Sequence, residues 1–158
     1  KRKMKMTTIV AFGDSHNLPL PPRLLSVAQE NDYVLFLGDG ITSLGDLLFL
    51  KNLHAVKGNC DPHGFNDEEI MQIGDFKILL THGDKYHVKR DLTSLKFRAQ
   101  ELGCNLVFYG HTHFADITQS DGITFICPGS LLSPLSGAPS YAYVVLTDEK
   151  ITAKIVNL

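Results

Sequence analysis

The chain has few cysteines, no long apolar run and no excess of basic residues. Its three cysteines, Cys60, Cys104 and Cys127, are odd in number and far apart, which argues against a disulfide framework and for a reducing compartment. No apolar run approaches the length of a transmembrane helix, and the run over residues 9–12, behind the basic N-terminus, is too short for a signal-peptide core. We therefore expect a cytoplasmic protein without a membrane partner.

The net charge and the chain length further restrict the class of protein. A formal net charge of -2 argues against a protein that binds nucleic acid through its overall charge, so nucleic acid is expected only as a substrate. The 158 residues, 44% hydrophobic and 20% charged, suit one globular domain, and no repeat or linker divides them. We expect a single domain over residues 1–158, with residues 1–6 as a disordered tail and Met4 or Met6 as the natural start.

Apolar runs and turn residues predict an alternation of strands and helices, followed by hairpins. The predicted strands cover residues 7–12, 33–37, 54–57, 69–73, 76–81, 106–109, 116–120, 123–127, 140–147 and 151–156. Helices are predicted from the prolines at 19–22 to about residue 30, through residues 44–50 behind a Thr42 or Ser43 cap, and over residues 91–102. Gly103 should stop the last helix. This order predicts an α/β fold with mixed sheets and helices packed outside.

Polar side chains follow five of the predicted strands at the point where each strand ends. In open α/β sheets the ligand site lies outside the carboxyl ends of the strands, so these loops can converge on one crevice. A glycine stands beside each group and permits a sharp turn and a close backbone approach. The side chains are Asp14, His16, Asp39, Asn59, His82, His111 and His113.

These seven side chains predict a site for two metal ions. Nitrogen and oxygen donors in this number are too many for one tetrahedral zinc ion and suit two ions that share a carboxylate. Imidazole, carboxylate and amide ligands suit manganese, our first choice, with nickel, zinc, iron, cobalt or magnesium as alternatives. Two carboxylates against two divalent ions leave a cationic pocket that attracts phosphate, in which a bridging water loses a proton near neutral pH.

Simpler interpretations exist for single residues. Asp14 and Asp39 are also good turn or helix-cap residues, Asn59 is an ordinary turn residue, and His111 with His113 alone would fit a solvated loop. The site hypothesis therefore depends on the ordered set. Several leucines in predicted loops are assigned to the core, to a substrate wall or to an oligomer contact, without a choice among them. They are Leu18, Leu20, Leu131, Leu132 and Leu135.

The motifs resemble, in this order, those of the calcineurin-like metallophosphoesterase superfamily. They are Asp14-x-His16, Gly38-Asp39, Gly58-Asn59-Cys60-Asp61, His82-Gly83 and Gly110-His111-Thr112-His113. The short chain and the Gly-Asn-Cys-Asp form resemble the small prokaryotic phosphodiesterase branch, which includes the retromer subunit Vps29. The resemblance covers residues 7–156 and implies a four-layer αββα sandwich, in which two mixed sheets are flanked by helices.

The resemblance also implies roles for the site residues. Asp14, His16, Asp39 and His113 would hold the first ion, Asp39 would bridge, and Asn59, His82 and His111 would complete the second site. A hydroxide bridging the two ions would attack the phosphorus of a small phosphodiester. Asp39, Asn59 and His111 would take part in that reaction, with Asn59 touching the phosphate.

Two departures from the family pattern concern the substrate. Cys60 stands where larger members often carry a histidine that protonates the leaving group, so substrates with good leaving groups should suffer least. Leu135 stands where an arginine often follows a proline, so any phosphate contact made by that arginine is lost. The alternatives are a phosphomonoesterase, a Vps29-like protein-binding scaffold with a vestigial metal site, and metal binding for stability alone. The resemblance favours a homo-oligomer.

Overall fold

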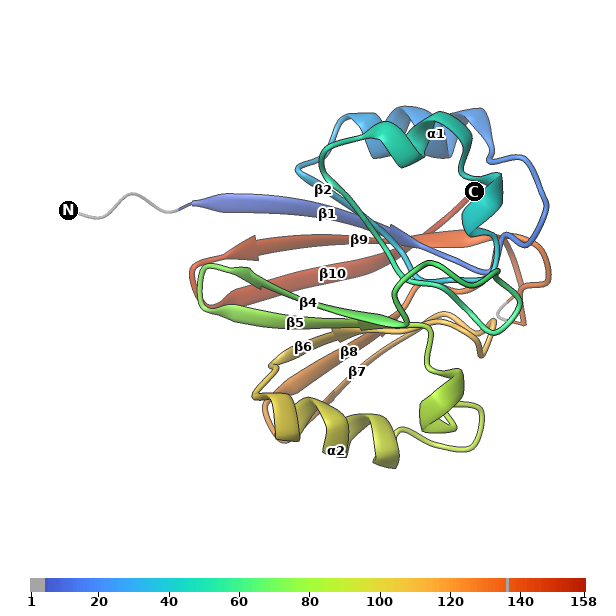
Figure 1. The fold of residues 1–158 in the computed structure, drawn as a ribbon. Helices are drawn as coiled ribbons and strands as arrows, with labels where there is room; N and C mark the ends of the chain where they lie inside the picture. Colours follow the sequence, from blue (N-terminus) through green and yellow to red (C-terminus); the bar gives the residue numbers. More distant parts are fainter. Residues whose placement is uncertain (1–4, 136) are drawn as a thin grey trace.

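The structure, a computed structural model, describes residues 5–135 and 137–158, and two five-stranded β-sheets form its centre (Figure 1). The first sheet has the order β10-β9-β1-β2-β3. Its strands are β1 (Met6–Phe12), β2 (Tyr33–Phe36), β3 (Leu53–Ala55), β9 (Ser140–Thr147) and β10 (Lys150–Asn157). Strands β1, β2 and β3 run parallel, whereas β9 pairs antiparallel with both β1 and β10. The sheet is therefore mixed, as predicted.

The second sheet is mixed in the same way and has the order β4-β5-β6-β8-β7. Its strands are β4 (Glu68–Ile73), β5 (Phe76–Thr81), β6 (Leu106–Phe108), β7 (Asp116–Ser120) and β8 (Ile123–Cys127). Strands β5, β6 and β8 are parallel in its centre, and β4 and β7 lie antiparallel at its edges. In each sheet, the carboxyl ends of the parallel strands therefore lie at the same end of the strands.

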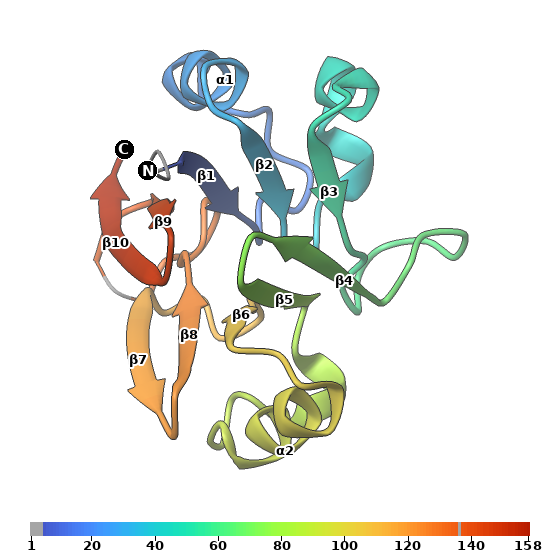
Figure 2. The same cartoon turned by 90° about the vertical axis from the view of Figure 1, so that its left-hand side faces the viewer.

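Helices cover the outer face of each sheet. Helix α1 (Pro22–Gln29) lies over the first sheet, and helix α2 (Thr93–Leu102) lies over the second, so the layers follow the order α, β, β, α (Figure 2). Short 3₁₀ helices span Ile41–Ser43, Gly45–Phe49 and Asp84–Tyr86. The predicted four-layer sandwich is confirmed. No helix in the described ranges is long and apolar enough to cross a membrane.

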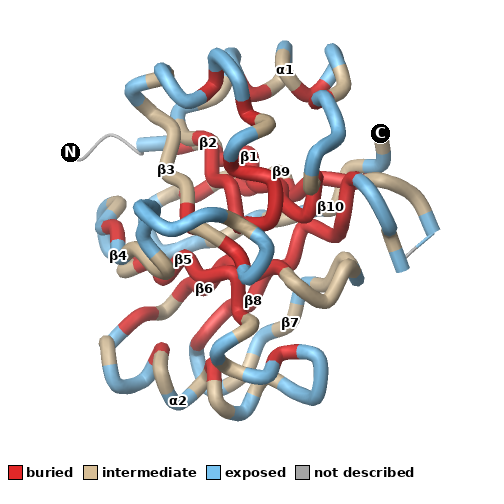
Figure 3. The backbone as a smooth tube through the Cα atoms, turned by 45° about the vertical axis from the view of Figure 1, so that its right-hand side comes forward, coloured by how far each residue is buried: buried red, intermediate tan, exposed pale blue. Residues whose placement is uncertain are grey.

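Three apolar clusters hold these layers together, because the parallel strands are buried on both faces (Figure 3). Along β1, Ile9 and Ala11 pack between the two sheets, whereas Val10 and Phe12 pack toward α1. This period of two explains why the strand reads in the sequence as one continuous apolar run. The third cluster joins α2 to the second sheet through residues such as Leu95.

Two local predictions need correction. The α-helix expected over residues 44–50 is instead a 3₁₀ helix at Gly45–Phe49 that follows another at Ile41–Ser43, because Gly45 at its start has a φ of +58° and Leu50 is extended. The Ser43 hydroxyl, predicted as a helix cap, donates 2.9 Å to the carbonyl of His16 and so fastens the loop after β1. Of the expected N-terminal tail, residues 1–4 lie outside the described ranges, and Met6 already belongs to β1.

The inter-sheet core yields a stability prediction. Phe108 on β6 is fully buried between the sheets, so Phe108→Ala should lower the free energy of unfolding by about 3–5 kcal/mol in urea titrations. The matched control is Phe97→Ala on α2, whose ring is 64% exposed and which should change it by no more than about 0.5 kcal/mol. Equal losses in the two variants would contradict this account of the core.

Candidate metal centre

The loops that leave β1, β2, β3, β5 and β6 meet at one end of the sandwich, the right-hand end in Figure 1. Backbone hydrogen bonds tie the first two loops together: Asp14 donates to the Gly38 carbonyl at 2.9 Å and His16 donates to the Asp39 carbonyl at 2.7 Å. The Gly110 amide similarly donates to the His82 carbonyl at 3.0 Å in the second sheet. Each sheet therefore holds its own loops in register before the two sets meet.

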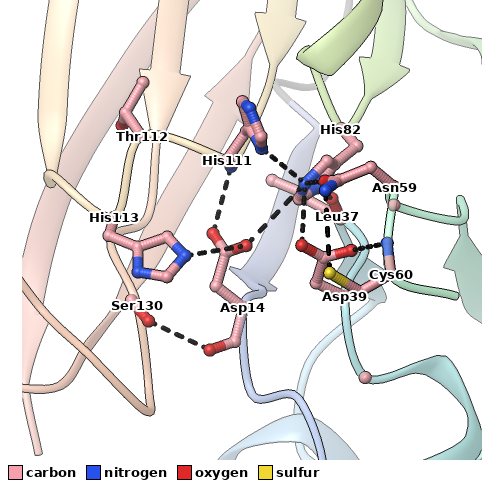
Figure 4. Close-up of polar contacts among 12 residues, drawn as sticks. Asp14, Leu37, Asp39, Asn59, Cys60, His82, His111, Thr112, His113 and Ser130 are labelled. Atoms are coloured by element: carbon pink, nitrogen blue, oxygen red, sulfur yellow. Dashed lines mark hydrogen bonds and ion pairs between the residues drawn. The ribbon is translucent and has the colours of Figure 1, made fainter. Parts of the chain in front are cut away.

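The His82 imidazole lies at the centre of the cluster (Figure 4). Its Nδ1 donates to the carbonyl oxygen of Leu37 at 2.7 Å, so the Nε2 of a neutral ring offers a lone pair. That Nε2 lies 3.1 Å from Asn59 Oδ1 and 3.2 Å from Asp39 Oδ2. It also lies 3.2 Å from Nδ1 of His111. Such a convergence of electron pairs calls for a proton or a cation.

A second group of donors surrounds Asp14, which is fully buried. Its Oδ2 accepts a hydrogen bond from the His111 amide at 3.1 Å, but its Oδ1 has no hydrogen-bond partner among the described residues. Nε2 of His113 lies 3.5 Å from this oxygen, and Nδ1 of the same ring donates to the Ser133 carbonyl at 3.0 Å. A buried carboxylate oxygen without a donor, facing an imidazole lone pair, fits a cation.

The donor atoms form three overlapping groups, and within each group they lie within 4.8 Å of one another. Asp14, His16 and His113 make the first, and Asp39, His82 and His111 make the second. His16 and Asp39 also form a group with Cys60, so Asp39 belongs to two groups. With Asn59 beside His82, the structure brings all seven predicted side chains into one cluster. Their chemistry and spacing fit two neighbouring divalent ions.

The electrostatics of the cluster agree with this fit. Burial opposes ionisation of Asp39, but the hydrogen bond and charge of His82 outweigh it and lower the carboxyl pKa to about 2. Burial likewise opposes protonation of His82, yet Asp39 and Asp14 raise the pKa of its imidazole above the usual value. The close contact with the Asp14 carboxylate raises the pKa of His113 against its burial. The cluster thus attracts positive charge between its two carboxylates.

The backbone of the ligand loops is strained. Residues other than glycine seldom adopt a left-handed conformation, and each one costs on the order of 1–3 kcal/mol. Five of the seven candidate ligands adopt it: Asp14, His16, Asp39, His111 and His113, with φ between 51° and 73°. The sequence had suggested that a glycine makes the sharp turn in each loop. In the loops after β1 and β6, the ligands themselves adopt the left-handed conformation, whereas the neighbouring Gly13 and Gly110 do not.

Two glycines are required for space. A Cβ on Gly58 would lie 2.1 Å from Oδ1 of Asp39, and a Cβ on Gly38 would lie 2.7 Å from Nδ1 of His82. Any side chain at either position would therefore displace a candidate ligand. The predicted close backbone approach is confirmed at these two loops.

Sequence reasoning missed the role of Asp61, although it lies in the Gly-Asn-Cys-Asp motif. Its Oδ2 accepts from the amides of Asp39 at 2.7 Å and Gly58 at 2.8 Å. Its Oδ1 accepts from the amides of Gly40 at 2.8 Å and Ile41 at 3.1 Å. One carboxylate therefore joins the loop after β2 to the loop after β3. The only sequence signal was an acidic residue within a short turn motif.

Two further residues support the site without belonging to the predicted ligand set. Ser130 is buried, and its hydroxyl donates to the carbonyl of Asp14 at 3.0 Å while accepting from the amides of Leu132 and Ser133. Cys60 has an exposed thiol, and its amide donates to Oδ1 of Asp39 at 2.8 Å. The backbone of Cys60 thus orients the shared carboxylate, whereas its thiol lies within 4.8 Å of donor atoms of His16 and Asp39.

Comparison with known proteins supplies an independent line of evidence. The family described as the calcineurin-like phosphoesterase superfamily domain matches residues 6–150. The probable metallophosphoesterase YsnB of Bacillus subtilis is 32% identical over 152 residues, 94% of this chain and 90% of that protein. A structure from Streptococcus pneumoniae, described as a predicted phosphoesterase, superposes with a TM-score of 0.84 at 26% identity, covering 98% of this chain and 91% of that chain. Zinc-complexed Vps29 from Entamoeba histolytica superposes with a TM-score of 0.74 at 25% identity, covering 95% and 98%.

The network around Asp61 yields a prediction about metal affinity. Asp61→Asn replaces one acceptor oxygen with a donor that faces backbone amides, so the loops holding Asp39 and Gly58 should separate. We expect Mn²⁺ affinity, measured by titration calorimetry, to fall about 10–100-fold. The control is Asp46→Asn, an exposed carboxylate on the neighbouring 3₁₀ turn, with unchanged affinity. An unaltered Mn²⁺ affinity in a folded Asp61→Asn variant would contradict the prediction.

Proposed function

Because the chain belongs to the calcineurin-like phosphoesterase superfamily, and is thus a metal-dependent hydrolase of phosphoric esters, we propose that it is a phosphodiesterase with a two-metal site. The observation that carries the proposal is the overlap of the donor groups: the group of Asp39, His82 and His111 shares Asp39 with the group of His16, Asp39 and Cys60, which in turn shares His16 with Asp14 and His113. Single-ion sites do not need two adjacent groups that share a carboxylate. Manganese is the proposed ion, with nickel, zinc, iron, cobalt and magnesium as the other choices to be tested.

The bound ions would supply Lewis acidity toward the phosphate and would acidify a water molecule. The chain's own residues prepare the site for this chemistry. The Leu37 and Ser133 carbonyls accept Nδ1–H from His82 and His113, which fixes each tautomer and turns Nε2 toward the donor cluster. The two carboxylates, Asp14 and Asp39, provide only about two negative charges against two divalent cations. The loaded site would therefore remain cationic and bind a phosphate anion.

Asn59 is suited to contact both the cluster and the substrate. Its Oδ1 faces His82 Nε2 at 3.1 Å, while its Nδ2 makes only a long contact of 3.6 Å with the Cys60 sulfur. The amide nitrogen can therefore donate to a non-bridging phosphate oxygen. His111 lies on the opposite side of His82 and is half-buried, and this position suits stabilisation of the charge that develops on the phosphoryl oxygens.

Two features of the opening favour a diester over a monoester. A diester carries one negative charge, so it depends less than a dianionic monoester on an extra arginine, and Leu135 occupies that position here. Cys60 is exposed at the rim, and burial together with nearby Asp39 raises the pKa of its thiol. A thiol is a weak proton donor at neutral pH, so substrates whose leaving groups need little protonation would react fastest.

The proposal predicts metal-dependent hydrolysis of bis(p-nitrophenyl) phosphate by protein stripped of metal and then loaded with Mn²⁺, Ni²⁺, Zn²⁺ or Mg²⁺. Asp39→Asn removes the carboxylate charge shared by the two donor groups that contain Asp39, so kcat should fall at least about 100-fold, as for loss of one transition-state contact. Asp75→Asn in the exposed β4–β5 turn is the matched control and should keep full activity.

The outcomes separate the candidate functions. Full activity in Asp39→Asn would end the two-metal proposal, and faster hydrolysis of p-nitrophenyl phosphate than of the diester would favour a phosphomonoesterase. Binding of two ions without turnover of either substrate would favour the scaffold, since zinc-bound Vps29 shares this fold. A large rise in melting temperature with metal, again without turnover, would indicate a structural metal site.

A further inference from the structure

A cavity of about 740 Å³ opens beside the metal centre, outside the predicted ligand set. We call this cavity the side pocket. Its walls include Lys89, Leu92, Tyr109, Phe114 and Leu135. The volume falls within the range of about 300–1,000 Å³ that is typical of small-molecule sites. These residues come from the segments before α2, at the end of β6, after His113 and after β8, so the side pocket is formed by loops around the strand ends.

The side pocket is continuous with the metal centre, because His111 and His113 line both. The side pocket is thus open to a group attached to a phosphate at the metal centre. The walls are fastened to the ligand loop. Leu135 donates its amide to the His113 carbonyl at 2.7 Å, and Phe114 donates its amide to the Thr112 hydroxyl at 3.1 Å.

The walls expose apolar surface that a ligand would cover. Phe114 is 51% exposed and Leu135 is 72% exposed, although both stand beside a charged site. Leu92 adds a half-buried aliphatic side chain, whereas Tyr109, which also borders the cavity, is 3% exposed and packs mainly in the core. Aromatic walls favour a planar ring over a flexible chain, because ring stacking adds to the burial of area. Stacking of a base on an aromatic side chain is worth about 1–3 kcal/mol.

Lys89 is the cationic group of the side pocket. It is exposed, and none of the carboxylates in the described part of the chain forms an ion pair with it within 4.0 Å. Lys89 lines the same cavity as His111 and His113, the two candidate ligands at its edge. A free cation in this position suits a phosphate oxygen.

We propose that the side pocket binds an aromatic ester group of the substrate, such as an aryl ring or a nucleobase, while Lys89 contacts the phosphate. The inference rests on the proposed function and specifies its substrate class. Lys89 would give a phosphate oxygen one cationic contact, and Phe114 with Leu135 would select a ring over a small alkyl group. Phe114 and Leu135 are thus specificity-determining residues, and Lys89 is a phosphate-binding residue.

The test measures binding of two inert probes to Mn²⁺-loaded protein by titration calorimetry. Phenylphosphonate and methylphosphonate carry the same phosphonate group and differ in the ring. Phenylphosphonate should bind at least about 5-fold more tightly, and Phe114→Ala should remove about 5- to 150-fold of its affinity while changing that of methylphosphonate less than about 2-fold. Lys89→Ala should weaken both probes by the same factor.

Two further variants keep the test decisive. Leu135→Ala should lower only phenylphosphonate affinity even if Phe114→Ala perturbs the neighbouring His113, and Phe97→Ala, an exposed ring on α2, should change neither probe. Equal affinities of the two probes in the unaltered protein, or full phenylphosphonate affinity in both pocket variants, would overturn the proposal.

A turnover measurement separates this inference from the proposed function. If bis(p-nitrophenyl) phosphate is hydrolysed but the pocket variants leave kcat/KM unchanged, the side pocket is not the ester site and the phosphodiesterase stands. If the pocket variants change probe affinity as expected but no diester is hydrolysed, aromatic recognition stands and the proposed activity fails.

Discussion

The structure depends on one electrostatic constraint: buried electron pairs face one another where the loops of the two sheets meet. Nε2 of His82 from the second sheet lies 3.2 Å from Oδ2 of Asp39 from the first sheet. Against the effect of burial, the two groups favour each other's charged forms, so the pKa of Asp39 is lowered to about 2 and that of His82 is raised. A divalent cation would satisfy the same electron pairs more completely, so the fold presents a site that favours metal binding.

The need to bring these donors together accounts for the backbone strain in the ligand loops. Five candidate ligands hold a left-handed backbone, and such strain persists only where the surroundings determine it. The surroundings here are the strands that the ligands follow, buried on both faces, together with the Asp61 carboxylate that accepts four backbone amides. Rigid layers below and a hydrogen-bonded loop network above thus keep the donors in place. The stability of the packed core thus offsets the backbone strain of the ligands at the metal centre.

Much of the fold and the gathering of the seven side chains could be predicted from the sequence, because both follow from short-range patterns. Apolar runs identify doubly buried strands, and polar residues behind them mark one edge of each sheet. The role of Asp61 could not be predicted, since an aspartate in a turn looks the same whether it caps its own loop or joins two. The 3₁₀ turns over residues 41–49 also escaped prediction, because the leucine spacing there suits an α-helix and Gly45 breaks it through its conformation alone.

The metal donors and the side pocket are held by different parts of the fold. The donors stand directly at strand ends, where the sheets leave little freedom, so the chemistry of the centre is set by the fold. The side pocket is built from longer segments, such as the one that carries Phe114 and the one that carries Leu135, which contact the ligand loop mainly through backbone hydrogen bonds. Side chains on these segments can change without moving a donor atom. The walls of the side pocket can therefore vary independently of the donors, and exposed Leu135 adds apolar surface there without contributing a donor atom.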